Sequence, residues 1–283
     1  MRFGVLTLPT AAWPELVERW RYLDDLGFDA IYMADGLVHP RDPSQTWFDG
    51  WICLATAAQV TRRARIGTLV TSMIFRNPAE VVHAAIAVDH ASSGRVELGI
   101  GSGDSEFDHA LAEIPDWPAR ERSQRFRDYA ARIRFLLEGG DDRLNPRPVQ
   151  QRIPLTIAAQ GRKALRVAAE FGDAWNTYGG RGLSSEEGRD LVRRRCEEFD
   201  SAVREVGRDP QAIRRSVLLG YGFIAEEPFR SEDAFAEVVE AWREIGMDEI
   251  VFYDPPERNA PPGSTIDPDV YERIVRDVMP QCS

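Results

Sequence analysis

Residues 76–108 read RNPAEVVHAAIAVDHASSGRVELGIGSGDSEFD, and this stretch predicts a helix, a buried strand and a site-like loop in succession. Pro78 suits the first turn of a helix, because its missing N–H costs nothing there and its fixed φ is already helical. We therefore predict a helix from about Pro78 to His90. The Ser-Ser-Gly sequence at 92–94 ends it, since glycine tolerates the positive φ of a helix terminus.

A short apolar strand follows, and glycine and acidic residues come directly after it. Val96, Leu98 and Ile100 lie two residues apart, as apolar residues do along a strand. The residues at and beyond its end are glycines, which leave room beside the backbone, and carboxylates: Gly99, Gly101, Gly103, Asp104, Glu106 and Asp108. We expect a functional loop at this point.

The rest of the chain alternates apolar strands with amphipathic helices. The predicted strands are Phe3–Leu8, Ala30–Met33, Ala64–Val70, Val96–Gly99, Leu155–Ala158, Ala174–Thr177, Ser216–Ile224 and Glu249–Tyr253. The predicted helices are Trp13–Leu26, Trp51–Val60, Ala79–His90, Arg122–Leu137, Lys163–Phe171, Ser185–Val206, Glu232–Ile245 and Asp269–Val278. This count predicts an α/β fold, a (β/α)8 TIM barrel, forming a single domain over residues 1–283. Three glycines are predicted to end helices in the left-handed conformation, namely Gly27, Gly172 and Gly246.

Composition argues against several classes of function. A net charge of −11 and a pI near 5.0 would repel nucleic acid and anionic membranes. No apolar run approaches the roughly 18 residues of a membrane span, and the first residues enter a strand directly, so we expect a cytoplasmic protein. The three cysteines are few and far apart, and His83 and His90 would lie about 10.5 Å apart along their helix. We expect no disulfide framework and no metal site.

A barrel of this kind carries its active site at the carboxyl ends of the strands. Two familiar motifs are absent there. A dinucleotide fingerprint GxGxxG would need glycine at Asp104 or Glu106. A nucleophile elbow GxSxG around Ser102 would need glycine at Ile100 and Asp104.

A phosphate site is predicted where the strand Leu155–Ala158 leads into a helix through Gln160, Gly161, Arg162 and Lys163. Free N–H groups and the helix dipole would meet the anion, with two cations alongside. The neighbouring residues 177–180 would supply a hydroxyl and further backbone donors. The alternative is that both cations are solvated surface residues. Cations oppose the dipole at a helix N-terminus unless an anion is present, and this favours the phosphate.

Residues 76–108, together with IPLTIAAQGRKALRVAAEFGDAWNTYGG at 153–180, resemble the bacterial luciferase-like superfamily of flavin- and deazaflavin-dependent oxidoreductases. TRRARIGTLVTS at 61–72 and GFDAIYMAD at 27–35 extend the resemblance. It implies a barrel that holds the coenzyme ring in its mouth. We expect an F420-dependent oxidoreductase that transfers a hydride between the deazaflavin and an unidentified small organic substrate. The alternatives are an FMN-dependent monooxygenase and a non-catalytic member of the same family. A homodimer is also considered, because related barrels commonly dimerise.

The resemblance also assigns residues by position. Ser72-Met73 falls where F420-dependent members carry a non-prolyl cis peptide bond. Asp104 falls where members with acid chemistry carry a glutamate and would donate a proton, the alternative being a loop-capping aspartate. Asp35 matches the acidic member of an Asp-His pair. The predicted cofactor-binding residues are Thr71, Ser72, Met73, Gly103, Gln160, Gly161, Arg162, Lys163, Thr177, Gly179 and Gly180.

The chain departs from the family pattern after Asp35, where Gly36 replaces the expected histidine. His39 is the predicted substitute, the alternative being an exposed loop histidine. Aromatic residues are expected to line the mouth and exclude water from hydride transfer: Trp47, Phe48, Trp51, Phe75, Trp117, Trp175 and Tyr178. For Trp51 the alternative is a place in the helix core.

Overall fold

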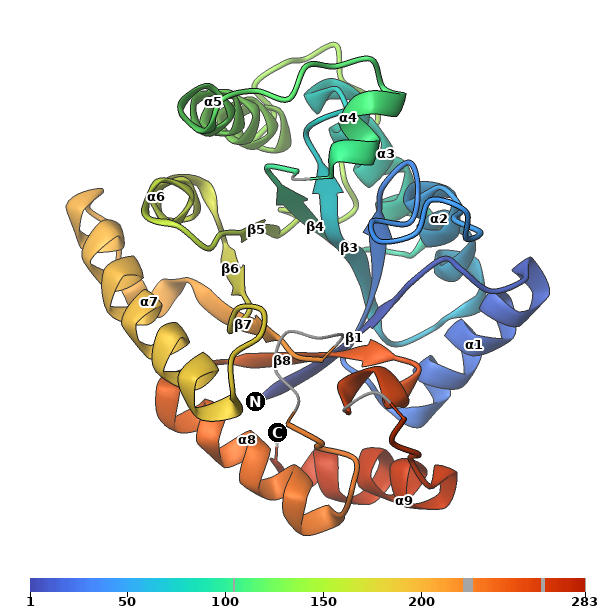
Figure 1. The fold of residues 1–283 in the computed structure, drawn as a ribbon. Helices are drawn as coiled ribbons and strands as arrows, with labels where there is room; N and C mark the ends of the chain where they lie inside the picture. The colour runs from blue at the N-terminus through green and yellow to red at the C-terminus, as the bar shows by residue number, and fades with distance from the viewer. Residues whose placement is uncertain (104, 221–225, 261–262, 283) are drawn as a thin grey trace.

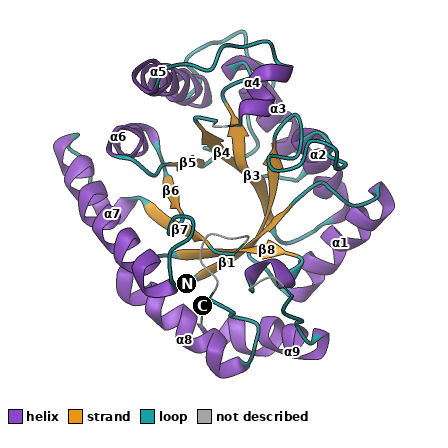
Figure 2. Cartoon of the chain, in the orientation of Figure 1, coloured by secondary structure: helices purple, strands orange, loops and turns teal. Residues whose placement is uncertain are grey.

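Eight parallel strands close into a barrel in chain order, and a ring of helices surrounds it (Figures 1 and 2). The structure is a computed structural model that describes residues 1–103, 105–220, 226–260 and 263–282. The strands are β1 (Arg2–Thr7), β2 (Ala30–Asp35), β3 (Arg65–Ser72), β4 (Val96–Gly101), β5 (Leu155–Ala158), β6 (Ala174–Thr177), β7 (Arg214–Leu218) and β8 (Glu249–Asp254). The predicted (β/α)8 TIM barrel is confirmed.

Helices follow the strands along the chain and most pack on the outside of the barrel (Figure 2), whereas α4 lies at the mouth, where its Asp108 lines the cavity. They are α1 (Trp13–Leu26), α2 (Gly50–Val60), α3 (Pro78–Ala91), α4 (Glu106–Leu111), α5 (Ala119–Leu137), α6 (Arg162–Phe171), α7 (Ser185–Glu205), α8 (Glu232–Ile245) and α9 (Pro268–Arg273). Short turns complete the set, namely η1 (Pro210–Ala212), η2 (Pro256–Asn259), the π-helical η3 (Ile274–Val278) and η4 (Met279–Cys282).

Most predicted boundaries hold within a few residues, and three differ in kind. The short helix α4 was not predicted; Ser105 caps it by accepting a hydrogen bond from the Asp108 N–H at 3.2 Å. The last predicted helix, Asp269–Val278, is α-helical only as far as Arg273. The strand predicted over Ser216–Ile224 is β7, which ends at Leu218, and residues 221–225 lie outside the described residues.

The helix predicted in the opening stretch is α3, and its ends are as expected. The Asn77 side chain caps it by accepting from the Ala79 N–H at 2.9 Å, with Pro78 in the first turn. Beyond its end, Ser93 and Gly94 have φ of 56° and 86°.

An outer core lies between the ring of helices and the strands. Its large side chains are fully buried, among them Trp20, Trp175 and Trp242. Each such side chain stabilises the fold by roughly 2–3 kcal/mol.

Two of the three glycines predicted to be left-handed have positive φ, and the third does not. Gly27 and Gly246 end α1 and α8 with φ of 122° and 90°. Gly172 has φ of −76°, so the prediction for it is wrong. A Cβ on Gly172 would lie 2.8 Å from the Ala168 carbonyl oxygen and 2.9 Å from that of Ala174. Glycine is needed there because helix and strand backbones approach closely, whatever the sign of φ.

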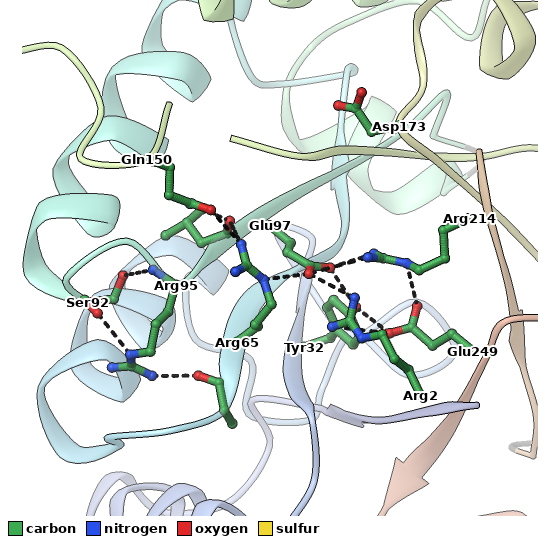
Figure 3. A network of polar contacts seen from close by, with 12 residues as sticks. Arg2, Tyr32, Arg65, Ser92, Arg95, Glu97, Gln150, Asp173, Arg214 and Glu249 are labelled. Atoms are coloured by element: carbon green, nitrogen blue, oxygen red, sulfur yellow. Dashed lines mark hydrogen bonds and ion pairs between the residues drawn. The ribbon is translucent and has the colours of Figure 1, made fainter. Parts of the chain in front are cut away.

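A network of charged side chains fills the amino-terminal end of the barrel, opposite the expected site (Figure 3). Glu97 on β4 is 1% exposed, and its carboxylate contacts Arg2 Nη1 at 3.0 Å, Arg65 Nε at 2.6 Å and Arg214 Nη2 at 2.6 Å. Tyr32 joins Glu97 to the equally buried Glu249 through its hydroxyl, at 3.1 and 2.9 Å. This cluster closes the bottom of the barrel and leaves the carboxyl end for the site.

None of the helices in the described ranges has the length and apolar character needed to cross a membrane. Across the same ranges, no group of three or more His, Cys, Asp or Glu side chains is placed to hold a metal ion. Cys53, Cys196 and Cys282 are free thiols.

Candidate active site at the barrel mouth

A cavity of about 330 Å³ lies at the carboxyl ends of the strands. Its apolar lining comes from the inner face of the barrel and from the loop after β2, with residues that include Leu6, Leu8, Val38, Pro40, Leu69, Val70, Leu218 and Tyr253. Its polar lining comes from the ends of β2–β6 and the loops after them: Asp35, Ser72, Ser102, Ser105, Asp108, Asn176 and Gln160. The volume is at the lower end of the range for small-molecule sites. An apolar floor with polar groups on its rim is suited to an aromatic ring with a polar edge.

Strand β3 carries a non-prolyl cis peptide bond between Leu69 and Val70, and both residues line the cavity. The bond therefore lies three residues earlier than predicted, and the assignment to Ser72-Met73 is corrected. The pairing of β3 with β4 shifts between Gly67 and Thr71, so the strand is irregular at the cis bond.

The three predicted cofactor-binding residues at the end of β3, Thr71, Ser72 and Met73, lie in different surroundings. Ser72 lines the cavity, and its Oγ accepts from the Ile74 N–H at 3.2 Å. Thr71 is fully buried and accepts from Trp51 Nε1 at 3.1 Å, while Met73 packs into the outer core. Gly103, across from Ser72, has φ of 66°, and a Cβ there would lie 2.6 Å from Ser72 Oγ. Ser72 and Gly103 thus come together at the cavity, whereas Thr71 and Met73 support it from behind.

Asp35 is a lining residue of the cavity, but its carboxylate is buried and has no contact with solvent. The side chain is 0% exposed and accepts two hydrogen bonds from Arg76, from Nη2 at 2.7 Å and Nε at 3.2 Å. Arg76 also contacts Asp49, the capping residue of α2, at 2.6 Å. Burial raises the pKa of Asp35, and its pairing with Arg76 opposes that effect. The carboxylate therefore ties the β2 end to the loop after β3.

At Gly36, where the family pattern has a histidine, the side chains of Trp47 and Asp108 lie close to the backbone. Trp47 Nε1 donates to the Gly36 carbonyl oxygen at 3.0 Å, and Asp108 Oδ1 accepts from the Leu37 N–H at 3.0 Å. A Cβ on Gly36 would lie 3.5 Å from both Asp108 Oδ2 and Trp47 Nε1. Trp47 and Asp108 both line the cavity, so they form the wall beside Gly36.

His39 is 3% exposed and is not among the lining residues of the cavity. Its Nδ1 accepts from the Asp42 N–H at 3.0 Å, and its ring meets that of Trp47 edge-on at 5.4 Å. Burial, with the nearby charge of Arg258, lowers the pKa of His39, which favours the neutral ring at pH 7. His39 therefore packs against Trp47 without lining the cavity itself.

Asp104, the predicted proton donor, lies outside the described residues, although its neighbours Gly103 and Ser105 line the cavity.

The β5–β6 rim brings Gln160 and Thr177 together, as predicted. Gln160 lines the cavity, and its Oε1 accepts from the Thr177 hydroxyl at 2.7 Å. Gly161 is the capping residue of α6, with no side-chain cap, and its Cβ position has no other atom within 4 Å. Gly161, Arg162 and Lys163 are exposed and are not lining residues of the cavity, and Lys163 faces a hollow between α5 and α6. Neither Arg162 nor Lys163 forms an ion pair with a described residue. Gly179 is buried, and Gly180 has φ of 98° in the loop after β6.

Sequence reasoning missed Arg195, on α7. Its Nη1 donates to Gln160 Oε1 at 2.8 Å and to the Tyr178 carbonyl oxygen. No local pattern marks this arginine, because it reaches the rim from a helix one full β/α unit away. Of the aromatic residues expected at the mouth, Trp47 and Tyr178 line it, whereas Trp175 belongs to the outer core and stacks on Phe199.

The chain belongs to the luciferase-like monooxygenase family, whose family model matches residues 1–269. The F420-dependent glucose-6-phosphate dehydrogenase of Amycolatopsis mediterranei is 29% identical over 214 residues, covering 67% of this chain and 63% of that protein. The 4-hydroxyprotoasukamycin monooxygenase of Streptomyces nodosus subsp. asukaensis is 27% identical over 242 residues, covering 81% of this chain and 63% of that protein.

The chain thus matches slightly less than two thirds of the length of each of these two relatives. A solved F420-dependent secondary alcohol dehydrogenase, in complex with an F420-acetone adduct, has the same fold with a TM-score of 0.80 and 17% identity, over 100% of this chain and 99% of that chain. The family resemblance of residues 76–108 and 153–180 is confirmed.

Proposed function

We propose that this chain is an F420-dependent oxidoreductase that transfers a hydride between the deazaflavin and a small organic substrate. The observation that carries the proposal is the cavity at the carboxyl ends of the strands, with its apolar floor and its polar β5–β6 rim. Relatives that are named as F420-dependent enzymes support the choice of coenzyme. When bound, the deazaflavin supplies the hydride chemistry at a ring carbon.

The residues at the mouth fit such a coenzyme. Leu69 and Val70 present apolar surface that suits the face of a flat ring. The open space at Gly161, together with the uncapped N–H groups of the first turn of α6, suits a phosphate. Arg162 and Lys163 flank that turn and would add positive charge. Their exposure and lack of ion pairs among the described residues agree with this role.

The chain's own residues would position the reactants and manage a proton. Trp47 and Tyr178 wall the cavity and would exclude water from the reacting carbons. Asp104 is proposed as the proton donor, from its place in the loop after β4. Asp35 and His39 are proposed to shape the β2 rim, since Arg76 holds the first and backbone N–H groups hold the second.

An FMN-dependent monooxygenase is the second candidate, because one relative is named a monooxygenase. Reduced flavin reacts with oxygen, whereas a deazaflavin does not readily do so. Oxygen consumption by the reduced holoenzyme therefore separates the two functions. A chain that binds coenzyme but turns over no member of a substrate panel would be a non-catalytic member, for which Gly36 is the motivating departure.

The test is a parallel titration of the purified protein with F420 and FMN, followed by absorbance and fluorescence. We expect saturable binding of F420 that is tighter than that of FMN. Gly161→Asp should weaken F420 binding by about tenfold or more, because a carboxylate would occupy the anion position and repel the phosphate. Gly161→Ala is the matched control and should bind normally, since nothing lies near the new methyl group. Tight FMN binding without F420 binding would overturn the choice of coenzyme.

A homodimer is proposed from the outward faces of α2 and α3, which are neighbours on the barrel. Ile52 on α2 is 59% exposed, and α3 exposes Ala79, Ala87 and Ala91 together with Glu80, His83 and His90. In a dimer, the exposed isoleucine and alanines would supply the apolar part of the contact and Glu80, His83 and His90 its polar part. Light scattering after size exclusion should give twice the monomer mass, and a monomer mass at micromolar concentration would contradict the proposal.

A further inference from the structure

The side-chain amide of Gln160 is held in one orientation. Its Oε1 accepts from the Thr177 hydroxyl at 2.7 Å, from Arg195 Nη1 at 2.8 Å and from the Tyr178 N–H at 3.4 Å. A guanidinium and a peptide N–H have no acceptor to offer. Turning the amide round would place its N–H2 against both of these donors, so the oxygen must face them.

The nitrogen of the same amide is therefore presented away from these donors. Gln160 lines the cavity, and among the described residues no acceptor takes a hydrogen bond from its Nε2. The group that the rim offers to a ligand is a donor with a fixed direction. An amide free to flip would offer a donor or an acceptor equally, and would not discriminate between ligands.

Arg195 fixes the orientation of the Gln160 amide. It lies on α7, and its Nη1 also donates to the Tyr178 carbonyl oxygen and, at 3.3 Å, to Thr177 Oγ1. Its guanidinium carbon is 5.9 Å from the centroid of the Tyr178 ring. Arg195 forms no ion pair with a carboxylate in the described ranges, although many other arginines of this chain do. Its described hydrogen bonds all go to the rim of the cavity.

We propose that Arg195 is a positioning residue that locks Gln160 as a donor, so that the rim selects ligands with an acceptor oxygen at that point. The chemical class is a carbonyl oxygen of a heteroaromatic ring edge or a phosphate oxygen. This inference rests on the proposed function, because the ligand in question is the coenzyme. It adds a specificity determinant that does not lie in the loops at the strand ends.

The test compares binding of F420 and of its phosphate-free chromophore to three variants. Arg195→Met removes the lock, and Gln160→Glu keeps the acceptor oxygen while removing the donor. Each should weaken binding by about three- to tenfold or more, the value of a hydrogen bond to a neutral group. Arg195→Lys should restore part of the affinity. Arg194→Met is the matched control, because it removes the same charge from an exposed neighbour on the same helix and should bind normally.

The two ligands distinguish the two sources of the oxygen. If both ligands lose the same factor in affinity, Gln160 donates to the ring edge. If only F420 is affected, it donates to the phosphate. Melting temperatures of the variants report whether the fold is intact.

A spectroscopic readout separates positioning from a merely structural role. The side-chain ¹⁵N–¹H2 resonances of Gln160, assigned by their absence in Gln160→Glu, should shift when F420 saturates the wild-type protein. In Arg195→Met the two resonances should move less on binding. Wild-type affinity in both variants, or unshifted Gln160 resonances at saturation, overturns the inference while leaving the proposed function standing. Failure of the wild-type protein to bind any coenzyme overturns both.

Discussion

Replacing Glu97 by glutamine should destabilise the barrel from its amino-terminal end. Three guanidiniums, those of Arg2, Arg65 and Arg214, contact the Glu97 carboxylate at 2.6–3.0 Å. In the variant, Arg2 and Arg214 would keep their contacts with Glu249, whereas Arg65 would lose its carboxylate partner. Breaking a buried ion pair by removing one partner costs about 3–5 kcal/mol. The three arginine side chains remain 21–31% exposed, so water compensates in part. We expect a loss of about 3 kcal/mol in the free energy of unfolding at pH 7.

The pH dependence gives an independent measure of the same interaction. Burial alone would raise the pKa of Glu97, but Arg214, Arg2 and Arg65 outweigh it and lower the pKa from 4.5 to about 2. A carboxyl group with a lower pKa in the folded state contributes stability that is complete above pH 4.5 and is lost as the pH falls toward 2. We therefore expect wild type to lose more stability than Glu97→Gln as the pH falls through this range.

The assay is urea unfolding followed by circular dichroism at pH 7 and pH 3. Glu121→Gln is the matched control, since Glu121 pairs with Arg125 on the surface and both side chains are about half exposed. That exposed pair is worth about 0.5 kcal/mol or less. The reasoning is refuted if Glu97→Gln stays within about 1 kcal/mol of wild type at pH 7. It is equally refuted if the variant loses as much stability as wild type between pH 7 and pH 3.

Three further changes test other parts of the structure. Gly172→Ala should lower stability by about 1–3 kcal/mol, because its Cβ would lie within 2.9 Å of two carbonyl oxygens; an unchanged melting temperature would contradict this. Arg76→Met should cost about 3 kcal/mol by leaving the buried Asp35 carboxylate without its partner, measured by denaturant unfolding. Asp104→Asn should slow turnover by orders of magnitude with nearly unchanged coenzyme affinity, and an unchanged rate would retire Asp104 as proton donor.

The barrel could be predicted from the sequence because each strand and helix carries its own local signal. Pro78, the Ser-Ser-Gly turn at 92–94 and the alternating apolar strand at 96–100 each act within a few residues, and the structure has all of them. The helix α4 was missed because its six residues, EFDHAL, are too short and too polar to show helical periodicity.

The site was less predictable, because it depends on contacts between distant segments. Gly172 looks like a left-handed cap in sequence, but its role comes from the approach of two backbones. Arg195 reaches the Gln160 amide from 35 residues away, and no local motif announces such a contact. Asp108 was read only as one acid of the loop after β4, and its place beside Gly36 follows from the turn that α4 makes.

The most direct test of the central claim is a crystal structure of the protein with F420 bound. Our account predicts the ring in the mouth against Leu69 and Val70, with the phosphate at the first turn of α6 beside Gly161. A coenzyme bound anywhere else on the molecule, or a ring in the mouth with its phosphate far from α6, would contradict it.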